Sequence, residues 1–227
     1  MKSTFYAGVA AAALLVGFAA PSHASLMLEV TDGSTTHTIT DFGNTGEAIF
    51  FGSLPGFSFS LDTGLSKPMI GSADQPVLDL NLDEVASRGG GGTLTFKLTD
   101  TGFDGDGGPI RFLDSVGGTF FGGGSLSVST FMDCDNDADG DSTPLTSATF
   151  SGSSFSGGQT ANVTACHHNY SLTELATLTL PGGAQFSGDA NLAVPEPPAI
   201  ALFGAGLLGL CFALRRKERP GSMTTAA

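Results

Sequence analysis

The chain of 227 residues contains no tryptophan and only two tyrosines, Tyr6 and Tyr170, although it has 18 phenylalanines and 33 glycines. Large polar aromatic rings are the usual platforms for sugar rings, so their scarcity counts against a glycosidase. The G-x-S-x-G, H-E-x-x-H, C-x-x-C and P-loop motifs are also absent. We therefore predict no catalytic residues. The alternative, a secreted hydrolase, rests only on the many Asp, Glu and Ser residues.

Basic residues are scarce as well: the chain has nine Lys and Arg against 22 Asp and Glu. Five of the nine lie near the two ends, so residues 25–194 hold 20 acidic and four basic residues, a net charge of −16. A field of this sign repels nucleic acid, which we exclude as a partner. The charge either attracts cations and basic surfaces or serves only solubility.

Long apolar patterns of helical period are absent between Ser25 and Val194, and the best helical candidate is a short turn at Leu82 to Ser87. Several segments alternate apolar and polar residues instead, as in Thr93 to Thr99. This alternation is typical of half-buried antiparallel strands. The predicted strands are 26–31, 36–40, 57–61, 76–80, 93–99, 126–132, 148–155, 170–180 and 184–192.

Turn-forming Gly, Asp, Asn and Pro residues separate these segments. About 170 residues suit one domain with a sizeable core. Eight or more short strands with Gly-rich connections predict an all-β fold, a single β-sandwich or jelly-roll-like domain over residues 25–193.

The N-terminus has the three regions of a secretory signal peptide. Lys2 supplies a positive start, Ala7 to Ala20 is apolar, and Ser22-His23-Ala24 offers a small-x-small cleavage site. We predict that residues 1–24 direct export through the Sec translocon and that Ser25 begins the mature protein.

The C-terminus joins three different pieces: a Pro/Glu segment at 194–198, an uncharged apolar run from Ala199 to Leu214, and the basic cluster Arg215-Arg216-Lys217. A helix over the apolar run covers roughly 24 Å, against a hydrocarbon core of about 30 Å. It spans if its flanks snorkel or the bilayer thins locally. The basic cluster fits a cytoplasmic membrane stop. We predict a transmembrane helix over 199–214 and a cytoplasmic tail over 220–227; a buried core helix is the alternative.

Taken together, these pieces resemble the PEP-CTERM sorting signal of Gram-negative bacteria, here over residues 194–219. The resemblance implies that an exosortase, a membrane protease or transpeptidase, cuts near Pro195-Glu196-Pro197 and releases or re-anchors the exported protein. It also implies a producer of exopolysaccharide or biofilm matrix. The chain departs from many members by continuing from Pro220 to Ala227.

Cysteine usage agrees with export. Cys134 and Cys166 lie in the exported body, and Cys211 lies in the apolar run. In an oxidising compartment we expect a Cys134–Cys166 disulfide, which closes a loop of about 33 residues and contributes roughly 3–4 kcal/mol. A transition-metal site at Cys166-His167-His168 is less favoured, because adjacent strand residues point to opposite faces.

Five aspartates alternate along one segment, and Asp135 to Gly140 match the D-x-D-x-D-G start of a calcium loop. Position twelve is Thr146 rather than the bidentate Glu, so an EF-hand is not expected. A looser Ca²⁺ site and a solvated acidic loop both remain open. The candidate ligands are Asp133, Asp135, Asp137, Asp139 and Asp141.

These features predict a non-enzymatic protein of the cell surface or extracellular matrix, with extracellular polysaccharide as a candidate partner. Its precursor is anchored in the inner membrane, and its mature form is displayed or secreted. The alternative is a calcium-dependent module that binds a ligand or glycan through the Asp133–Asp141 loop.

Overall fold

The computed structural model describes residues 25–195, whose regular structure is twelve β-strands. The predicted signal peptide (1–24), Glu196, Pro197, the transmembrane helix, the basic cluster and the cytoplasmic tail lie outside these residues. The strands are β1 (Met27–Thr31), β2 (Thr36–Thr40), β3 (Glu47–Leu54), β4 (Phe57–Leu65), β5 (Val77–Ser87), β6 (Gly91–Phe103), β7 (Pro109–Phe121), β8 (Ser125–Asp133), β9 (Thr143–Ser151), β10 (Ser154–Thr164), β11 (Tyr170–Pro181) and β12 (Gln185–Ala193).

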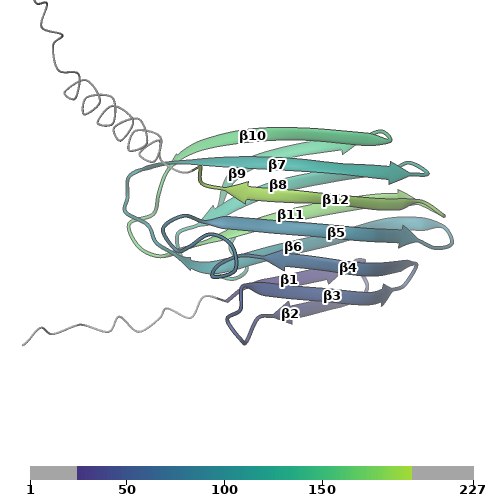
Figure 1. Cartoon of the computed structure of the whole chain (residues 1–227), viewed down its shortest axis with the longest axis horizontal. Coiled ribbons are helices and arrows are strands. Elements are labelled where there is room, and N and C mark those ends of the chain that lie inside the picture. Colours follow the sequence, from purple (N-terminus) through teal and green to yellow (C-terminus); the bar gives the residue numbers. More distant parts are fainter. Residues whose placement is uncertain (1–24, 196–227) are drawn as a thin grey trace, which may run out of the picture.

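The strands form two six-stranded antiparallel sheets packed face to face (Figure 1). Sheet A has the order β2-β1-β6-β11-β8-β9, and sheet B has the order β10-β7-β12-β5-β4-β3. Along one side the two edge strands are bridged, because the Gln159 amide exchanges two 2.9 Å hydrogen bonds with the backbone of Ser147. The predicted all-β sandwich is confirmed.

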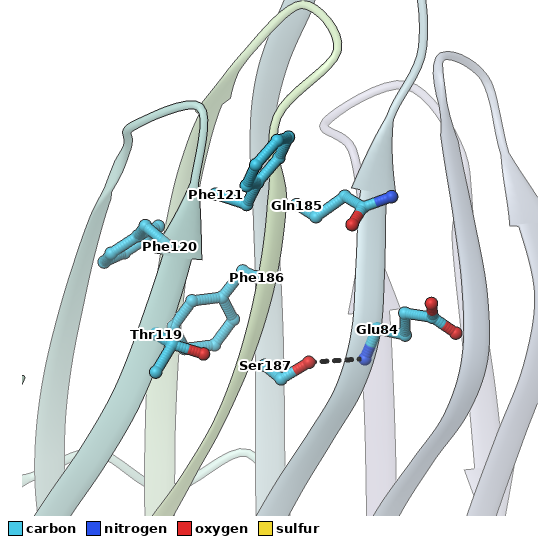
Figure 2. Close-up of a pocket in the computed structure, with 7 residues that line it drawn as sticks. All are labelled: Glu84, Thr119, Phe120, Phe121, Gln185, Phe186 and Ser187. Carbon is cyan, nitrogen blue, oxygen red and sulfur yellow. Dashed lines mark hydrogen bonds between the residues drawn. The ribbon is translucent and has the colours of Figure 1, made fainter. Parts of the chain in front are cut away.

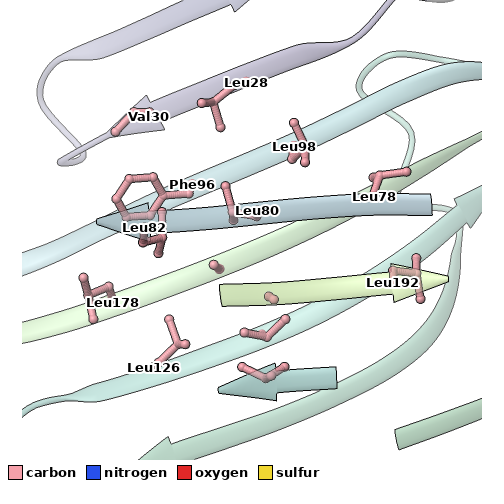
Figure 3. Close-up of a cluster of buried hydrophobic side chains, with 14 of the residues drawn as sticks. Leu28, Val30, Leu78, Leu80, Leu82, Phe96, Leu98, Leu126, Leu178 and Leu192 are labelled. Carbon is pink, nitrogen blue, oxygen red and sulfur yellow. The ribbon is translucent and has the colours of Figure 1, made fainter. Parts of the chain in front are cut away.

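Period-two burial builds the core between the sheets. In β6 the inward positions hold Leu94, Phe96 and Leu98, while Thr93 and Thr95 face outward. The same alternation in the facing sheet brings apolar side chains of both sheets into one cluster. Figure 3 shows part of this layer, with Leu28 and Leu178 from sheet A and Leu80 and Leu192 from sheet B.

Two sequence expectations are wrong, and both misplace local structure. Leu82 to Ser87 is the end of β5 and not a helical turn. A β-bulge opposite β12 puts the buried Leu82 and Val85 three residues apart, which imitates helical spacing. The predicted strand 148–155 instead crosses the β9–β10 turn, where Gly152 adopts a φ of 105° that favours glycine. Strands β3 and β7 were not predicted, and neither was β10 beyond Phe155.

The antiparallel course gives the sandwich two distinct ends (Figure 1). We call the tail end the one where residue 195 leaves the fold; its connections are 41–46, 66–76, 104–108, 134–142 and 165–169. The far end has the shorter connections 32–35, 55–56, 88–90, 122–124, 152–153 and 182–184. Residues 25 and 195 both lie at the tail end.

Candidate functional site

The two ends differ strongly in charge. The far-end connections hold one acid, Asp32, and one base, Arg88, whereas the tail-end connections hold eight aspartates against Lys67. The eight are Asp41, Asp74, Asp104, Asp106, Asp135, Asp137, Asp139 and Asp141. Negative potential is therefore concentrated where the chain continues toward its C-terminus.

The Asp133–Asp141 loop folds back over the outer face of sheet A. The hydroxyl groups of Ser171 and Thr173 donate to the carbonyls of Asp137 and Gly140 at 2.7 and 3.0 Å. At Gly140 a Cβ atom would clash with the buried Asp133 side chain, so a larger residue would have to displace Asp133. These contacts fix the backbone of the loop against the sheet.

Three of the five carboxylates in the loop have separate partners within the protein. Asp133 Oδ1 accepts the Asp135 N–H at 2.9 Å, and Asp137 Oδ1 accepts the Asp139 N–H at 3.2 Å. Asp139 Oδ1 lies 3.1 Å from Lys97 Nζ. Among residues 25–195, no group of three or more His, Cys, Asp or Glu side chains is arranged to hold a metal ion. The arrangement does not fit a preformed Ca²⁺ site, and calcium binding stays a prediction.

Cys134 and Cys166 form a disulfide with their Cα atoms 5.4 Å apart. It ties the acidic loop to the β10–β11 connection. Beside it, the Cys166 carbonyl accepts the Gly107 N–H at 2.9 Å, and the ring of His167 packs on Gly107. His167 and His168 are both exposed, and a disulfide sulfur is not a thiolate ligand.

A buried ion pair closes the tail end of the core. Lys67 Nζ lies 2.8 Å from Asp100 Oδ2, donates to the Thr101 carbonyl at 2.6 Å and sits 3.6 Å from the centroid of the Phe103 ring. The Ser66 hydroxyl donates to the same Asp100 oxygen at 2.6 Å. Burial lowers the pKa of Lys67, and the charges of Asp100 and Asp104 oppose this shift.

A hollow of about 380 Å³ opens at the tail end, and its lining includes Asp74, Asp104, Asp106 and Val194. The Asp106 carboxylate accepts the Gly108 N–H at 2.8 Å. The hollow thus combines an acidic lining with the point of exit of the C-terminal segment.

Besides Asp100, which pairs with Lys67, three more carboxyl groups are fully buried in the sandwich: Asp62, Asp114 and Glu174. Asp114 Oδ2 accepts the Thr146 hydroxyl across the two sheets at 2.7 Å. One oxygen of Asp62, one of Asp114 and both of Glu174 have no hydrogen-bond partner. Sequence reasoning missed this group, although period two places Glu174 on the same face as the buried Ala176.

Burial is the main cause of the altered pKa values of these acids. It raises the pKa of Asp62 to about 8, with the Asp83 N–H bond opposing the shift. It raises the pKa of Glu174 well above the usual range, aided by the nearby charge of Asp114. The pKa of Asp114 is raised by burial and lowered in part by the Thr146 hydroxyl. These groups favour the neutral form inside the core.

The far end carries a different site on the outer face of sheet B, which we call the far-end hollow (Figure 2). Its volume is about 160 Å³. Phe121 is 73% exposed there and lies opposite Gln185 in the strand register. The hollow is lined by Glu84, Thr119, Phe120, Phe121, Gln185, Phe186 and Ser187.

The outer face of sheet A is covered by rows of hydroxyl groups. The strand register aligns Thr36, Thr31, Thr95, Thr177, Ser127 and Thr149 across all six strands. Neighbours pair with each other, as in Ser127 with Thr149 at 2.8 Å. Part of this row is therefore hydrogen-bonded within the face itself, since the Thr36 hydroxyl also donates to Thr31 Oγ1 at 2.9 Å.

Comparison with protein families places one motif in this chain. The model described as the PEP-CTERM protein-sorting motif matches residues 193–217. The chain is thus an all-β protein that carries a PEP-CTERM motif after its last strand. The motif implies an exported, membrane-associated precursor that is targeted to an exosortase. Within residues 25–195 the structure has no helix long and apolar enough to cross a membrane.

Similarity to solved structures is slight. The enzymatically active domain of tailspike protein 4 from bacteriophage CBA120 is 10% identical with a TM-score of 0.30, over 63% of this chain and 18% of that chain. The C-terminal CBM6 of LamC, a marine laminarinase from Zobellia galactanivorans, is 14% identical with a TM-score of 0.22, over 56% of this chain and 86% of that chain. No curated protein matches.

Proposed function

We propose that this chain is a non-enzymatic protein of the cell surface or extracellular matrix, released or re-anchored by cleavage near Pro195-Glu196-Pro197. In this proposal the signal peptide exports residues 25–193 through the Sec translocon. The apolar run 199–214 then holds the precursor in the inner membrane, with Arg215-Arg216-Lys217 on the cytoplasmic side.

The observation that carries the proposal is the direct junction between the folded domain and the sorting motif. Ala193 is still paired in β12 with Val77 and Leu113, and the Val194 N–H donates to the Pro76 carbonyl at 3.1 Å. Pro195 is exposed. A cut near this point therefore removes the tail without cutting into the core.

Replacing Pro195-Glu196-Pro197 by three alanines in the producing bacterium tests the proposal. We expect the variant to stay in the membrane fraction at precursor size, while the wild type and the matched variant Pro220→Ala reach their shorter mature form. Immunoblots of the fractions and mass spectrometry of the mature C-terminus supply the measurement. A triple variant that reaches the mature size at the normal rate would refute exosortase-type processing.

A calcium-dependent ligand- or glycan-binding module is the alternative function. Its candidate ligands are the five aspartates of the Asp133–Asp141 loop; the carboxylates of Asp133, Asp137 and Asp139 would have to leave their present contacts and converge with the other two. Nothing in the geometry favours it over the first proposal.

A further inference from the structure

The far-end hollow is built by three neighbouring strands of sheet B. Phe121 comes from β7, Gln185 and Ser187 from β12, and Glu84 from β5 (Figure 2). The Glu84 N–H donates to Ser187 Oγ at 3.1 Å, and Ser60 on β4 donates its hydroxyl to Glu84 Oε2 at 2.9 Å. Hydrogen bonds from two adjacent strands therefore fix both the backbone and the carboxylate of Glu84.

Glu84 owes its position to an irregular backbone. The pairing of β12 with β5 slips between Phe186 and Gly188, which forms a β-bulge. Glu84 lies in this bulge with a φ of 54°, a left-handed conformation that is uncommon for residues other than glycine. Bulges of this kind re-aim side chains and are frequent beside binding sites. Glu84 borders the hollow beside Gln185, and its carboxylate extends toward Ser60 on β4 (Figure 2).

A packed aromatic layer supports the hollow from below. The rings of Phe120 and Phe186 lie 4.8 Å apart, and both are buried. Gly118 makes this possible, because a Cβ atom there would lie 2.8 Å from the Phe186 ring. A floor of packed rings holds the hollow in one shape before any ligand arrives, which lowers the entropic cost of binding.

The groups around the hollow match one class of ligand. A single exposed phenylalanine is ordinary on a protein surface, but Phe121 lies opposite the primary amide of Gln185, and Glu84 holds a fixed carboxylate at the border of the hollow. A sugar ring has an apolar C–H face that can lie on Phe121, and hydroxyl protons that Glu84 can accept. The Gln185 amide both donates and accepts. A small number of polar groups that converge around an apolar surface is typical of sites for small ligands.

The negative charge around the hollow narrows the class of ligand further. Glu84 is the charged residue among those that line the hollow, and residues 25–194 carry a net charge of −16. Phosphorylated, sulfated or uronic-acid sugars would meet repulsion at this site. We propose that the far-end hollow binds a neutral saccharide unit of an extracellular polysaccharide, with Phe121 as the platform and Glu84 and Gln185 as its hydrogen-bonding groups.

The place of the hollow suits this role. It lies at the end of the sandwich opposite to residue 195, so a polymer has access to it while the domain is still tethered by its tail. The inference rests on the proposed export of the domain. A failure of this inference can be told apart from a failure of the proposed export and processing, because the alanine replacement of Pro195-Glu196-Pro197 reports on processing and not on sugar binding.

Affinity electrophoresis in native gels tests the inference with the full-length protein in mild detergent. The gels contain hydroxyethyl cellulose, laminarin, dextran or galactomannan as neutral polymers, alginate as an anionic one and chitosan as a cationic one. We expect at least one neutral polymer to retard the wild type. Phe121→Ala should weaken that binding about tenfold or more, and Glu84→Gln should weaken it less.

Phe51→Ala is the matched control, since Phe51 is also 73% exposed on sheet B but lies on β3, outside the hollow. It should bind like the wild type, and circular dichroism should show that all three variants keep the β fold. Lack of retardation by every neutral polymer would overturn the inference. So would binding that Phe121→Ala leaves unchanged, or retardation by alginate or chitosan alone.

Discussion

Replacing Asp62 by asparagine should change how the stability of the domain depends on pH. The Asp62 side chain is fully buried in β4, its Oδ1 accepts the Asp83 N–H at 3.2 Å, and its Oδ2 has no partner. Asparagine keeps the shape and the acceptor but cannot ionise. The variant therefore isolates the cost of a buried negative charge.

The direction of this pH dependence follows from the linkage between proton binding and folding. Burial raises the pKa of Asp62 from 3.8 to about 8, so the folded state binds a proton that the unfolded state releases. The stabilising effect of this proton is complete below about pH 4 and is lost as pH rises toward 8. Each unit of this window costs about 1.4 kcal/mol, which sums to the order of 5 kcal/mol at most.

Thermal unfolding of the full-length protein in detergent, followed by circular dichroism between pH 4 and pH 9, supplies the measurement. Between pH 5 and pH 8 the wild type should lose on the order of 10 °C of Tm more than Asp62→Asn. The matched control Asp141→Asn removes an exposed carboxylate and should follow the wild type. Parallel pH curves for Asp62→Asn and the wild type would refute this reasoning.

Two further predictions concern the tail end. Lys67→Met keeps the length of the side chain but leaves the buried Asp100 charge without its partner, so we expect a loss of about 3–5 kcal/mol in urea unfolding; a loss below 1 kcal/mol would contradict a structural role for the pair. If the Asp133–Asp141 loop binds Ca²⁺, millimolar calcium should raise the Tm reversibly against a chelator, and Asp135→Asn should abolish the rise. An unchanged Tm, together with no calcium uptake in equilibrium dialysis, would leave a solvated acidic loop.

Local patterns predicted the strands whose alternation is regular. Thr93 to Thr99 lies in β6, and 170–180 lies in β11, because each has one apolar and one hydroxyl-bearing face. Prediction failed where the backbone departs from period two. The bulge at Glu84 hid the end of β5, and the predicted strand 148–155 ran across the β9–β10 turn.

The candidate sites also differ in how far the sequence predicts them. The five aspartates and the cysteine pair are visible as residue types at a given spacing, but whether carboxylates converge depends on loop folding. Ser171 and Thr173, which hold the loop carbonyls, lie more than thirty residues after the residues that they contact. No local sequence pattern encodes such contacts. The far-end hollow has no sequence signal, since Phe121 and Gln185 meet only through the pairing of β7 with β12.

The sequence by itself determined that this chain carries a sorting motif at 193–217 and folds as an all-β domain, because both are written in short-range composition and period. Only the tertiary structure decided which end of the domain is acidic, which carboxyls are buried and where an exposed aromatic side chain lies opposite a side-chain amide. The physical reason is that strand pairing joins residues far apart in the chain. Burial and charge proximity, which set chemistry, arise only from that pairing.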